Sequence, residues 1–300
     1  MPPLPLPLPR NAEIERRRAW LDSHGEALDD VAAYGYHVLA RTALRESLRR
    51  LDAAGIPALV VKGVVLAYLL YDTPIDRPLV DVDLRVRPAD LPRALAALQA
   101  APPHGERARP LVSSRVQQTA VVSLHRIQID LESHIGPRFV CKTSVATMLQ
   151  RAERTDQGLG FPHLRPELHD HAVLLAINLF KDRMTGGAWR TRDLERIVRL
   201  PGFDPETLGA RAAEAGCLTI VYVVARYLAD TQGDPILDAV ARRIRPPRPR
   251  FAAHVLSTLR GEHRIPLLAW RVEVRAAADS LARSAAAVGA AALTRLGSTK

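Results

Sequence analysis

The sequence contains little cysteine and no long uninterrupted apolar run. Cys141 and Cys217 are its only cysteines in 300 residues. Two distant cysteines make neither a disulfide framework nor a zinc site, which fits the reducing cytoplasm. Charged residues interrupt the apolar stretches well before the ~20 residues that a membrane helix requires. We therefore expect a cytoplasmic globular protein without a membrane span.

A secretory signal is also missing from the first residues. The opening MPPLPLPLPR alternates proline with leucine, and it has neither a basic start nor an apolar helix-forming core. We predict a disordered proline-rich tail over residues 1–12. Docking of a polyproline arm on a partner is the less favoured alternative.

Aromatic residues are scarce, at 5% of the chain, and this scarcity affects how the basic charge is interpreted. The net charge is +10, and residues 241–300 alone carry twelve Arg and Lys against three acids, a local net charge of +9. Such a segment can bind nucleic acid or lipid headgroups. Phe251 and Trp270 are the only aromatic residues there that can stack on bases. An arginine-rich surface is therefore favoured over nucleic-acid binding.

The chain is organised around a strand, a helix and a second strand. Residues 58–61 form a short apolar run with β-branched side chains, which predicts a strand, and Lys62 and Gly63 end it. Residues 64–71 are apolar enough for a buried helix. Turn residues then break the chain before residues 79–86, which again predict a strand.

The second strand carries two aspartates on one face. Side chains alternate along a strand, so Asp81 and Asp83 share the face opposite the apolar residues. Neighbouring carboxylates repel and tend to need a cation, and hard oxygen pairs suit magnesium. Lys62 at the strand end and Arg77 in the preceding loop supply cations for phosphate oxygens. We interpret this pattern as a metal site that handles a nucleoside triphosphate; the alternative is an edge strand with two solvated aspartates.

These segments resemble the signature of a known family. LVVKGVVLAYLLY followed by RPLVDVDLRV is similar to the uncharacterised bacterial nucleotidyltransferase family of the DNA polymerase beta-like superfamily. Val80 departs from this signature, because a small residue is usual there. The resemblance implies a small mixed sheet flanked by helices, with two magnesium ions held by three carboxylates. The matching positions are Lys62, Gly63, Tyr71, Arg77, Pro78, Asp81, Asp83 and Leu84.

A third carboxylate follows in the next pair of predicted strands. Residues 116–124 and 127–131 predict a hairpin, in which Asp130 and Glu132 face away from the apolar side chains. The resemblance assigns the third metal-binding acid to Asp130, which would also accept the proton of the attacking hydroxyl. Glu132 and His134 are lesser candidates for the same pocket.

From residue 166 onward the apolar spacing is helical. The first helix ends near Lys181, close to a position where the family commonly has histidine, and we expect Lys181 to contact phosphate. Asp193 lies in a segment similar to the family's Trp…Asp-Leu segment, and a helix cap is favoured over catalysis for it. His169 and His171 are two residues apart, so they point to different sides of a helix. We interpret them as surface histidines rather than zinc ligands.

The predicted fold class is α+β: a small mixed β-sheet nucleotidyltransferase core with a helical C-terminal lobe. We expect about four to six strands within residues 55–135 and helices from residue 165 onward. The last helix is predicted to be long and alanine-rich, at about 267–294. The core lobe with its N-terminal helices spans residues 13–160, and the helical lobe with its basic C-terminal helix spans 161–300.

The resulting prediction is a magnesium-dependent nucleotidyltransferase, with manganese as an alternative ion. It would move a nucleoside monophosphate, from ATP or another triphosphate, to a hydroxyl or similar acceptor on a small molecule, peptide or protein. Two alternatives stay open: a catalytically inactive nucleotide-binding scaffold on the same fold, and a nucleic-acid-associated protein that uses the basic C-terminal segment. The candidate residues are Asp81, Asp83 and Asp130 for catalysis and metal, and Lys62, Gly63, Arg77 and Lys181 for the nucleotide.

Overall fold

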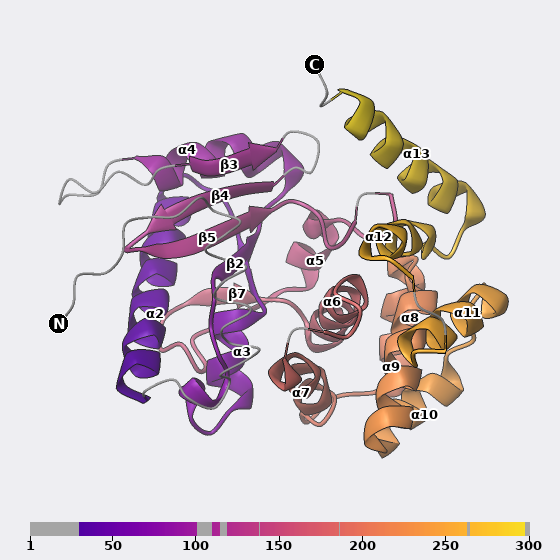
Figure 1. Ribbon diagram of the computed structural model, residues 1–300. Helices are drawn as coiled ribbons and strands as arrows, with labels where there is room; N and C mark the ends of the chain where they lie inside the picture. Colours follow the sequence, from indigo (N-terminus) through magenta and orange to yellow (C-terminus); the bar gives the residue numbers. More distant parts are fainter. Residues whose placement is uncertain are drawn as a thin grey trace.

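The structure is a computed structural model that describes residues 30–100, 110–114, 119–137, 139–185, 187–262 and 265–297. The predicted proline-rich tail at 1–12 lies outside these ranges. A seven-stranded mixed sheet occupies one side of the described molecule, and a set of helices occupies the other (Figure 1). The predicted α+β class is confirmed.

The sheet contains the strands in the order β3-β4-β5-β2-β1-β7-β6. β2 pairs with β5 and β1 pairs with β7 in parallel, whereas the other neighbours are antiparallel. The central strands β1 and β2 are completely buried, so the middle of the sheet is covered on both faces. The strands are β1 Leu59–Val61, β2 Val82–Arg85, β3 Pro110–Ser114, β4 Thr119–Leu124, β5 Ile127–Glu132, β6 Glu153–Thr155 and β7 His163–Arg165.

The β6–β7 hairpin extends the sheet beyond the predicted range of 55–135. Each of its strands has three residues. A single register pair, Leu59 with Leu164, joins β7 to β1. Strands this short contain too few residues to show an alternating pattern, so tertiary pairing is what reveals them.

Helices α2 and α4 pack against each other and against the β4–β5 part of the sheet. The predicted helical spacing in α2 is visible as buried residues one turn apart, among them Leu44, Leu48 and Leu51. The helix α3 follows β1 directly and packs on β1 and β2. The helices of this half are α2 Asp30–Ala53, α3 Gly63–Leu70, α4 Leu91–Gln99 and α5 Val145–Arg151.

The second half of the chain is helical, as predicted. Its centre is α6, which is buried along nearly its whole length and packs against α7, α8, α9 and α12. No helix in the described ranges combines the length and the apolar character needed to cross a bilayer. The helices are α6 Leu168–Lys181, α7 Ala188–Ile197, α8 Pro205–Ala215, α9 Leu218–Gln232, α10 Pro235–Arg243, α11 Pro249–Leu259, α12 Leu267–Ala276 and α13 Leu281–Gly297.

The prediction of one long alanine-rich helix at 267–294 is wrong. The structure has two helices, α12 and α13, with a break between them. In the break, the Asp279 carboxylate accepts hydrogen bonds from the backbone N–H groups of Leu218 (2.7 Å) and Thr219 (2.9 Å). Asp279 therefore caps the first turn of α9, and this tertiary capping bond stabilises the interruption.

The interpretation of His169 and His171 as surface residues is also wrong. Both are buried, because α6 is surrounded by other helices and by the sheet. The two cysteines, far apart in the sequence, meet in the fold as free thiols. A hydrogen bond with Cys141, together with burial, raises the pKa of the Cys217 thiol well above its usual value.

Candidate functional site

The β4–β5 hairpin brings Asp130 beside Asp83. Its two turn residues, His125 and Arg126, both have a positive φ (50° and 63°), as two-residue hairpin turns require. Alternate β5 residues are buried, so the polar ones share the other face. β5 then pairs in parallel with β2 in a register that places Asp130 opposite Asp83.

Three carboxylates converge at this point. Asp83, Asp130 and Glu132 each offer one oxygen atom, and these oxygens lie within 4.8 Å of one another. Asp83 is only 5% exposed, so its charge needs a partner. Carboxylate oxygens are the ligands that magnesium and manganese prefer, and this donor set fits either ion.

Cations surround the three carboxylates. Lys62 Nζ lies 2.9 Å from Asp83 Oδ1, and Arg85 Nη1 lies 2.7 Å from Glu132 Oε2. Burial alone would raise the pKa of Glu132. The cations, Arg85 first and then Lys62, outweigh burial and lower that pKa to about 2. Glu132 therefore carries a full negative charge at neutral pH.

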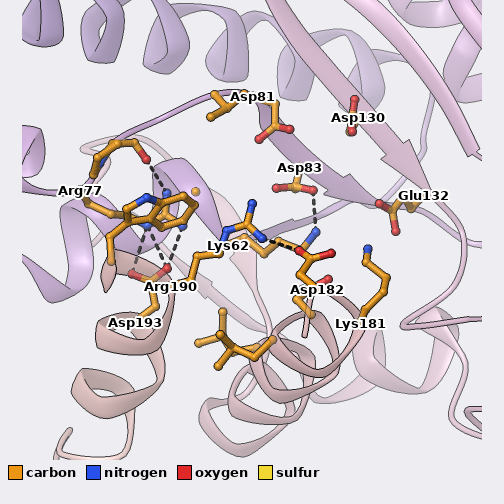
Figure 2. A pocket seen from close by; sticks show the side chains of 17 residues that line it. Lys62, Arg77, Asp81, Asp83, Asp130, Glu132, Lys181, Asp182, Arg190 and Asp193 are labelled. Atoms are coloured by element: carbon orange, nitrogen blue, oxygen red, sulfur yellow. Dashed lines mark hydrogen bonds and ion pairs between the residues drawn. The ribbon is translucent and has the colours of Figure 1, made fainter. Parts of the chain in front are cut away.

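The carboxylates form one wall of a pocket with an empty volume of about 830 Å³, open solvent at its mouth included. Residues of β2 and β5 face residues of α6 and α7 across it (Figure 2). All seven residues predicted from the sequence line this one pocket: Lys62, Gly63, Arg77, Asp81, Asp83, Asp130 and Lys181. The pocket thus lies between the sheet and the helical half of the chain.

Asp81 does not lie on the strand, contrary to the prediction of a strand over 79–86. β2 begins at Val82, because the register of β1 pairs Val61 with Asp83 and β1 ends there. Asp81 belongs to the preceding loop and lines the pocket next to the cluster (Figure 2). The third member of the cluster of close carboxylates is Glu132 and not Asp81.

The loop that carries Asp81 is tied to α2. The Tyr36 hydroxyl donates to the Val80 backbone oxygen at 2.6 Å. The Nε2 of His37 lies 3.1 Å from the backbone oxygen of Arg77. Burial lowers the pKa of His37 to about 4, so the ring is neutral and donates this hydrogen bond from Nε2. These two bonds hold the loop against α2.

The turn from β1 into α3 brings Lys62 and Gly63 to the pocket. Lys62 has φ 54° and ψ −138°, and its backbone N–H donates to His171 Nε2 at 3.2 Å. Burial lowers the pKa of His171 to about 3, which keeps this nitrogen an acceptor. A Cβ at Gly63 would lie 3.3 Å from the Asp81 backbone oxygen. Glycine therefore permits the close approach of the loop.

Residues 32–233 match the family model described as uncharacterised nucleotidyltransferase. The chain belongs to this nucleotidyltransferase family. No curated protein and no solved structure matches the chain. The matched range contains every pocket residue and ends just after α9, so α10 to α13 lie outside it.

Arg77 is paired with Asp193 in this family member. Its Nε lies 3.1 Å from both carboxylate oxygens and its Nη2 lies 2.8 Å from Oδ2, while the Tyr71 hydroxyl donates to Oδ1 at 2.9 Å. The guanidinium also lies 4.6 Å from the centre of the Trp189 ring. Asp193 lies in the middle of α7, so its interpretation as a helix cap is wrong. A phosphate contact by Arg77 stays a prediction.

Lys181 differs from the other pocket cations. Among the described residues it has no ion-pair partner, whereas Arg190, also in the pocket, pairs with Asp182. The surrounding protein removes water from the Lys181 ammonium group, and this desolvation lowers its pKa. The positive charge of Lys62 nearby lowers the pKa further. An unpaired ammonium group in a pocket is a ready ligand for an anion.

Sequence reasoning ranked Glu132 too low and overlooked Asp182, Trp189 and Arg190. The signal for Glu132 was present, because strand alternation puts it on the same face as Asp130. Trp189 was marked only by the resemblance, as the tryptophan of the Trp…Asp-Leu segment, and no signal marks Arg190. They enter the pocket only because α7 packs beside α3, and the two helices are far apart in the sequence.

Proposed function

We propose that this protein is a divalent-metal-dependent nucleotidyltransferase, which moves a nucleoside monophosphate from a nucleoside triphosphate to a hydroxyl or similar group. The observation that carries the proposal is the convergence of Asp83, Asp130 and Glu132 in one pocket within the family match. Close carboxylates repel one another unless cations compensate them. Their convergence beside a pocket lysine suits a ligand that brings both a metal ion and phosphates.

Asp83 and Asp130 would hold the metal together with Glu132, and Asp81 would join them from its loop. Magnesium or manganese fits the oxygen donors, and when bound such an ion neutralises phosphate charge and lowers the pKa of an attacking hydroxyl. Gln128 Nε2 donates to Asp130 Oδ1 at 2.7 Å. This hydrogen bond fixes the direction of the carboxylate.

Lys181 and Lys62 would bind the triphosphate. Lys181 extends from the end of α6 toward Glu132 (Figure 2) and has no competing ion pair among the described residues. The backbone around Gly63 begins α3, and the N-terminus of a helix favours anions. Arg77 would hold α7 against the loop through Asp193 and so shape the phosphate side of the pocket.

Asp130 is our candidate for the general base. Its carboxylate lies in the pocket, where an acceptor hydroxyl can approach within hydrogen-bonding distance. The helical half, which provides α6 and α7, would select the acceptor. We propose a small molecule, a peptide or another protein for this role, and any of the four triphosphates as donor.

One observation favours a second candidate, a catalytically inactive nucleotide-binding scaffold. Two of the three clustered carboxylates already have cationic partners, Lys62 for Asp83 and Arg85 for Glu132. An inactive protein would use these ion pairs in place of metal. The nucleic-acid alternative is less favoured, because arginines of the basic segment pair within the fold, such as Arg242 with Asp238 and Arg260 with Asp230.

The test uses the purified protein with each α-labelled triphosphate, magnesium and a cell extract as the source of acceptors. We expect label to appear on one component of the extract with release of pyrophosphate, and EDTA should abolish both. Asp130→Asn should slow both by roughly 10²–10³. A protein that binds nucleotide but never releases pyrophosphate would be a scaffold, and the enzymatic proposal would then fail.

A further inference from the structure

Lys62 places its ammonium group beside the carboxylate cluster, in contact with Asp83. Its Nζ lies 2.9 Å from Asp83 Oδ1, and its side chain is 17% exposed. Asp83 has the register position opposite Asp130, so the ammonium group contacts a carboxylate that belongs to the cluster of close acids. In Figure 2 a dashed line joins the Lys62 ammonium group to the Asp83 carboxylate.

The backbone at Lys62 is unusual for a residue with a side chain. Its φ of 54° with ψ of −138° lies in a region that glycine adopts far more easily. Such a conformation is strained and persists where the surroundings enforce it. The hydrogen bond from Lys62 N to His171 Nε2 anchors this backbone, so it is the side chain that can change position.

A lysine and a divalent cation compete for Asp83. A metal ion bound to this carboxylate would lie ~2.0–2.1 Å from one of its oxygens, close to the ammonium group. Two positive charges at such a distance repel strongly where water is largely excluded. The phosphates of an anionic ligand that enters the pocket give the ammonium group a new partner.

We propose that Lys62 serves as the counter-ion of Asp83 in the nucleotide-free protein and moves to the triphosphate when metal and nucleotide enter together. This inference rests on the proposed function. It follows that metal alone binds weakly, because it must displace Lys62 without compensation. Nucleotide strengthens metal binding, because its phosphates accept the displaced ammonium group. The coupling is reciprocal, so metal strengthens nucleotide binding by the same factor.

The test measures manganese binding by electron paramagnetic resonance, with and without a non-hydrolysable triphosphate. Lys62→Met removes the charge and keeps most of the stem. We expect manganese to bind about tenfold more tightly to this variant than to the wild type without nucleotide. In the wild type the nucleotide should strengthen manganese binding, and in the variant this gain should shrink. Lys142→Met, which removes an exposed lysine outside the pocket, is the matched control.

Lys62→Gly is a second variant, because glycine suits the backbone conformation and guards against misfolding of Lys62→Met. Unchanged or weaker manganese binding in folded Lys62 variants would overturn the inference while leaving the metal site standing. Absence of manganese binding by the wild type even with nucleotide would overturn the proposed function as well. A crystal structure of the wild type with both ligands gives a direct check. Lys62 still within ion-pair distance of a metal-bound Asp83 would contradict the exchange.

Discussion

Asp193 receives the guanidinium of Arg77 through three contacts of 2.8–3.1 Å, and both side chains are almost completely buried. Arg77 comes from the loop before β2 and Asp193 from the middle of α7. If either partner of such a buried ion pair is removed, the other charge stays buried and unpaired, and this strongly destabilises the native state. The pair therefore joins the sheet half of the pocket to the helical half.

Asp193→Ala should destabilise the protein by about 3–5 kcal/mol, because it leaves the Arg77 charge buried and unpaired. Urea denaturation measures the loss. The control is Asp238→Ala, which removes partly exposed ion pairs with Arg226 and Arg242 and should cost no more than about 1 kcal/mol. Equal losses in the two variants would contradict a special role for the buried pair.

Asp130→Asn should lower the rate of nucleotide transfer by roughly 10²–10³, the size seen when one electrostatic contact of a transition state is removed. The fold should persist, because a like-charge repulsion near Asp83 is relieved. Pyrophosphate release with the identified acceptor measures the rate. Asp81→Asn should lower it comparably if the loop carboxylate joins the metal site. Asp156→Asn, at an exposed position outside the pocket, should keep the wild-type rate.

Lys181→Met should weaken triphosphate binding and thereby raise KM, with kcat nearly unchanged if the contact is equal in the ground and transition states. The reason is that its ammonium group has no ion pair among the described residues to replace. Direct titration with a fluorescent triphosphate gives the dissociation constant independently of the acceptor. A variant that binds this triphosphate as tightly as the wild type would remove Lys181 from the site.

Trp270 should contribute to the pocket although it lies outside the matched family range. Its indole Nε1 donates to the backbone oxygen of Lys181 at 3.2 Å, and its ring lies 5.3 Å from that of Phe180. Trp270→Phe should cost about 1–3 kcal/mol of stability, because the change removes this hydrogen bond and leaves part of the buried volume of Trp270 unfilled. It should also weaken triphosphate binding. The exposed Val272→Ala is the control, and equal binding by both variants would make Trp270 purely structural.

Acid should destabilise the protein in two separate pH windows. Burial lowers the pKa of His37 to about 4 and of His171 to about 3, so between pH 6.5 and these values the unfolded chain binds more protons than the native state. Stability therefore falls as pH drops through this range, by about 2 kcal/mol per histidine at pH 5. Glu132, with a pKa of about 2 in the fold, should add a loss between pH 4.5 and 2.

Urea denaturation at a series of pH values measures both windows. His171→Gln retains an acceptor for the Lys62 backbone N–H and should flatten the curve between pH 6.5 and 4. His254→Gln, at an exposed position, should leave its slope unchanged. A wild-type curve that is level from pH 7 to 5 would show that the buried histidines do not control acid stability.

Much of the pocket could be predicted from local pattern. Apolar runs and breaking residues located β1, α3 and β2 to within a few residues. Alternation along β5 placed Asp130 on a polar face, and helical spacing ended α6 at Lys181. Local chemistry suffices here, because the period of the side chains follows directly from backbone geometry.

Other features depend on partners distant in the chain. The predicted strand included Asp81, but β2 starts at Val82. The reason is that β1, with which β2 pairs, ends opposite Asp83. The sequence predicted a phosphate contact for Arg77 and a helix cap for Asp193. In the structure the two side chains form an ion pair with each other. The predicted long helix is interrupted where Asp279 caps α9. No local pattern contains these relationships.

By itself, the sequence determined the fold class, the family and the residue types that reach the pocket, because periodicity and motifs depend only on the order of residues along the chain. Only the tertiary structure decided how those residues are paired. Sheet register selected Asp83, Asp130 and Glu132 as the close carboxylates, and packing placed Lys62 beside them. The physical reason is that the energy of a buried charge depends on what lies within a few ångströms of it in space, wherever that neighbour lies in the chain.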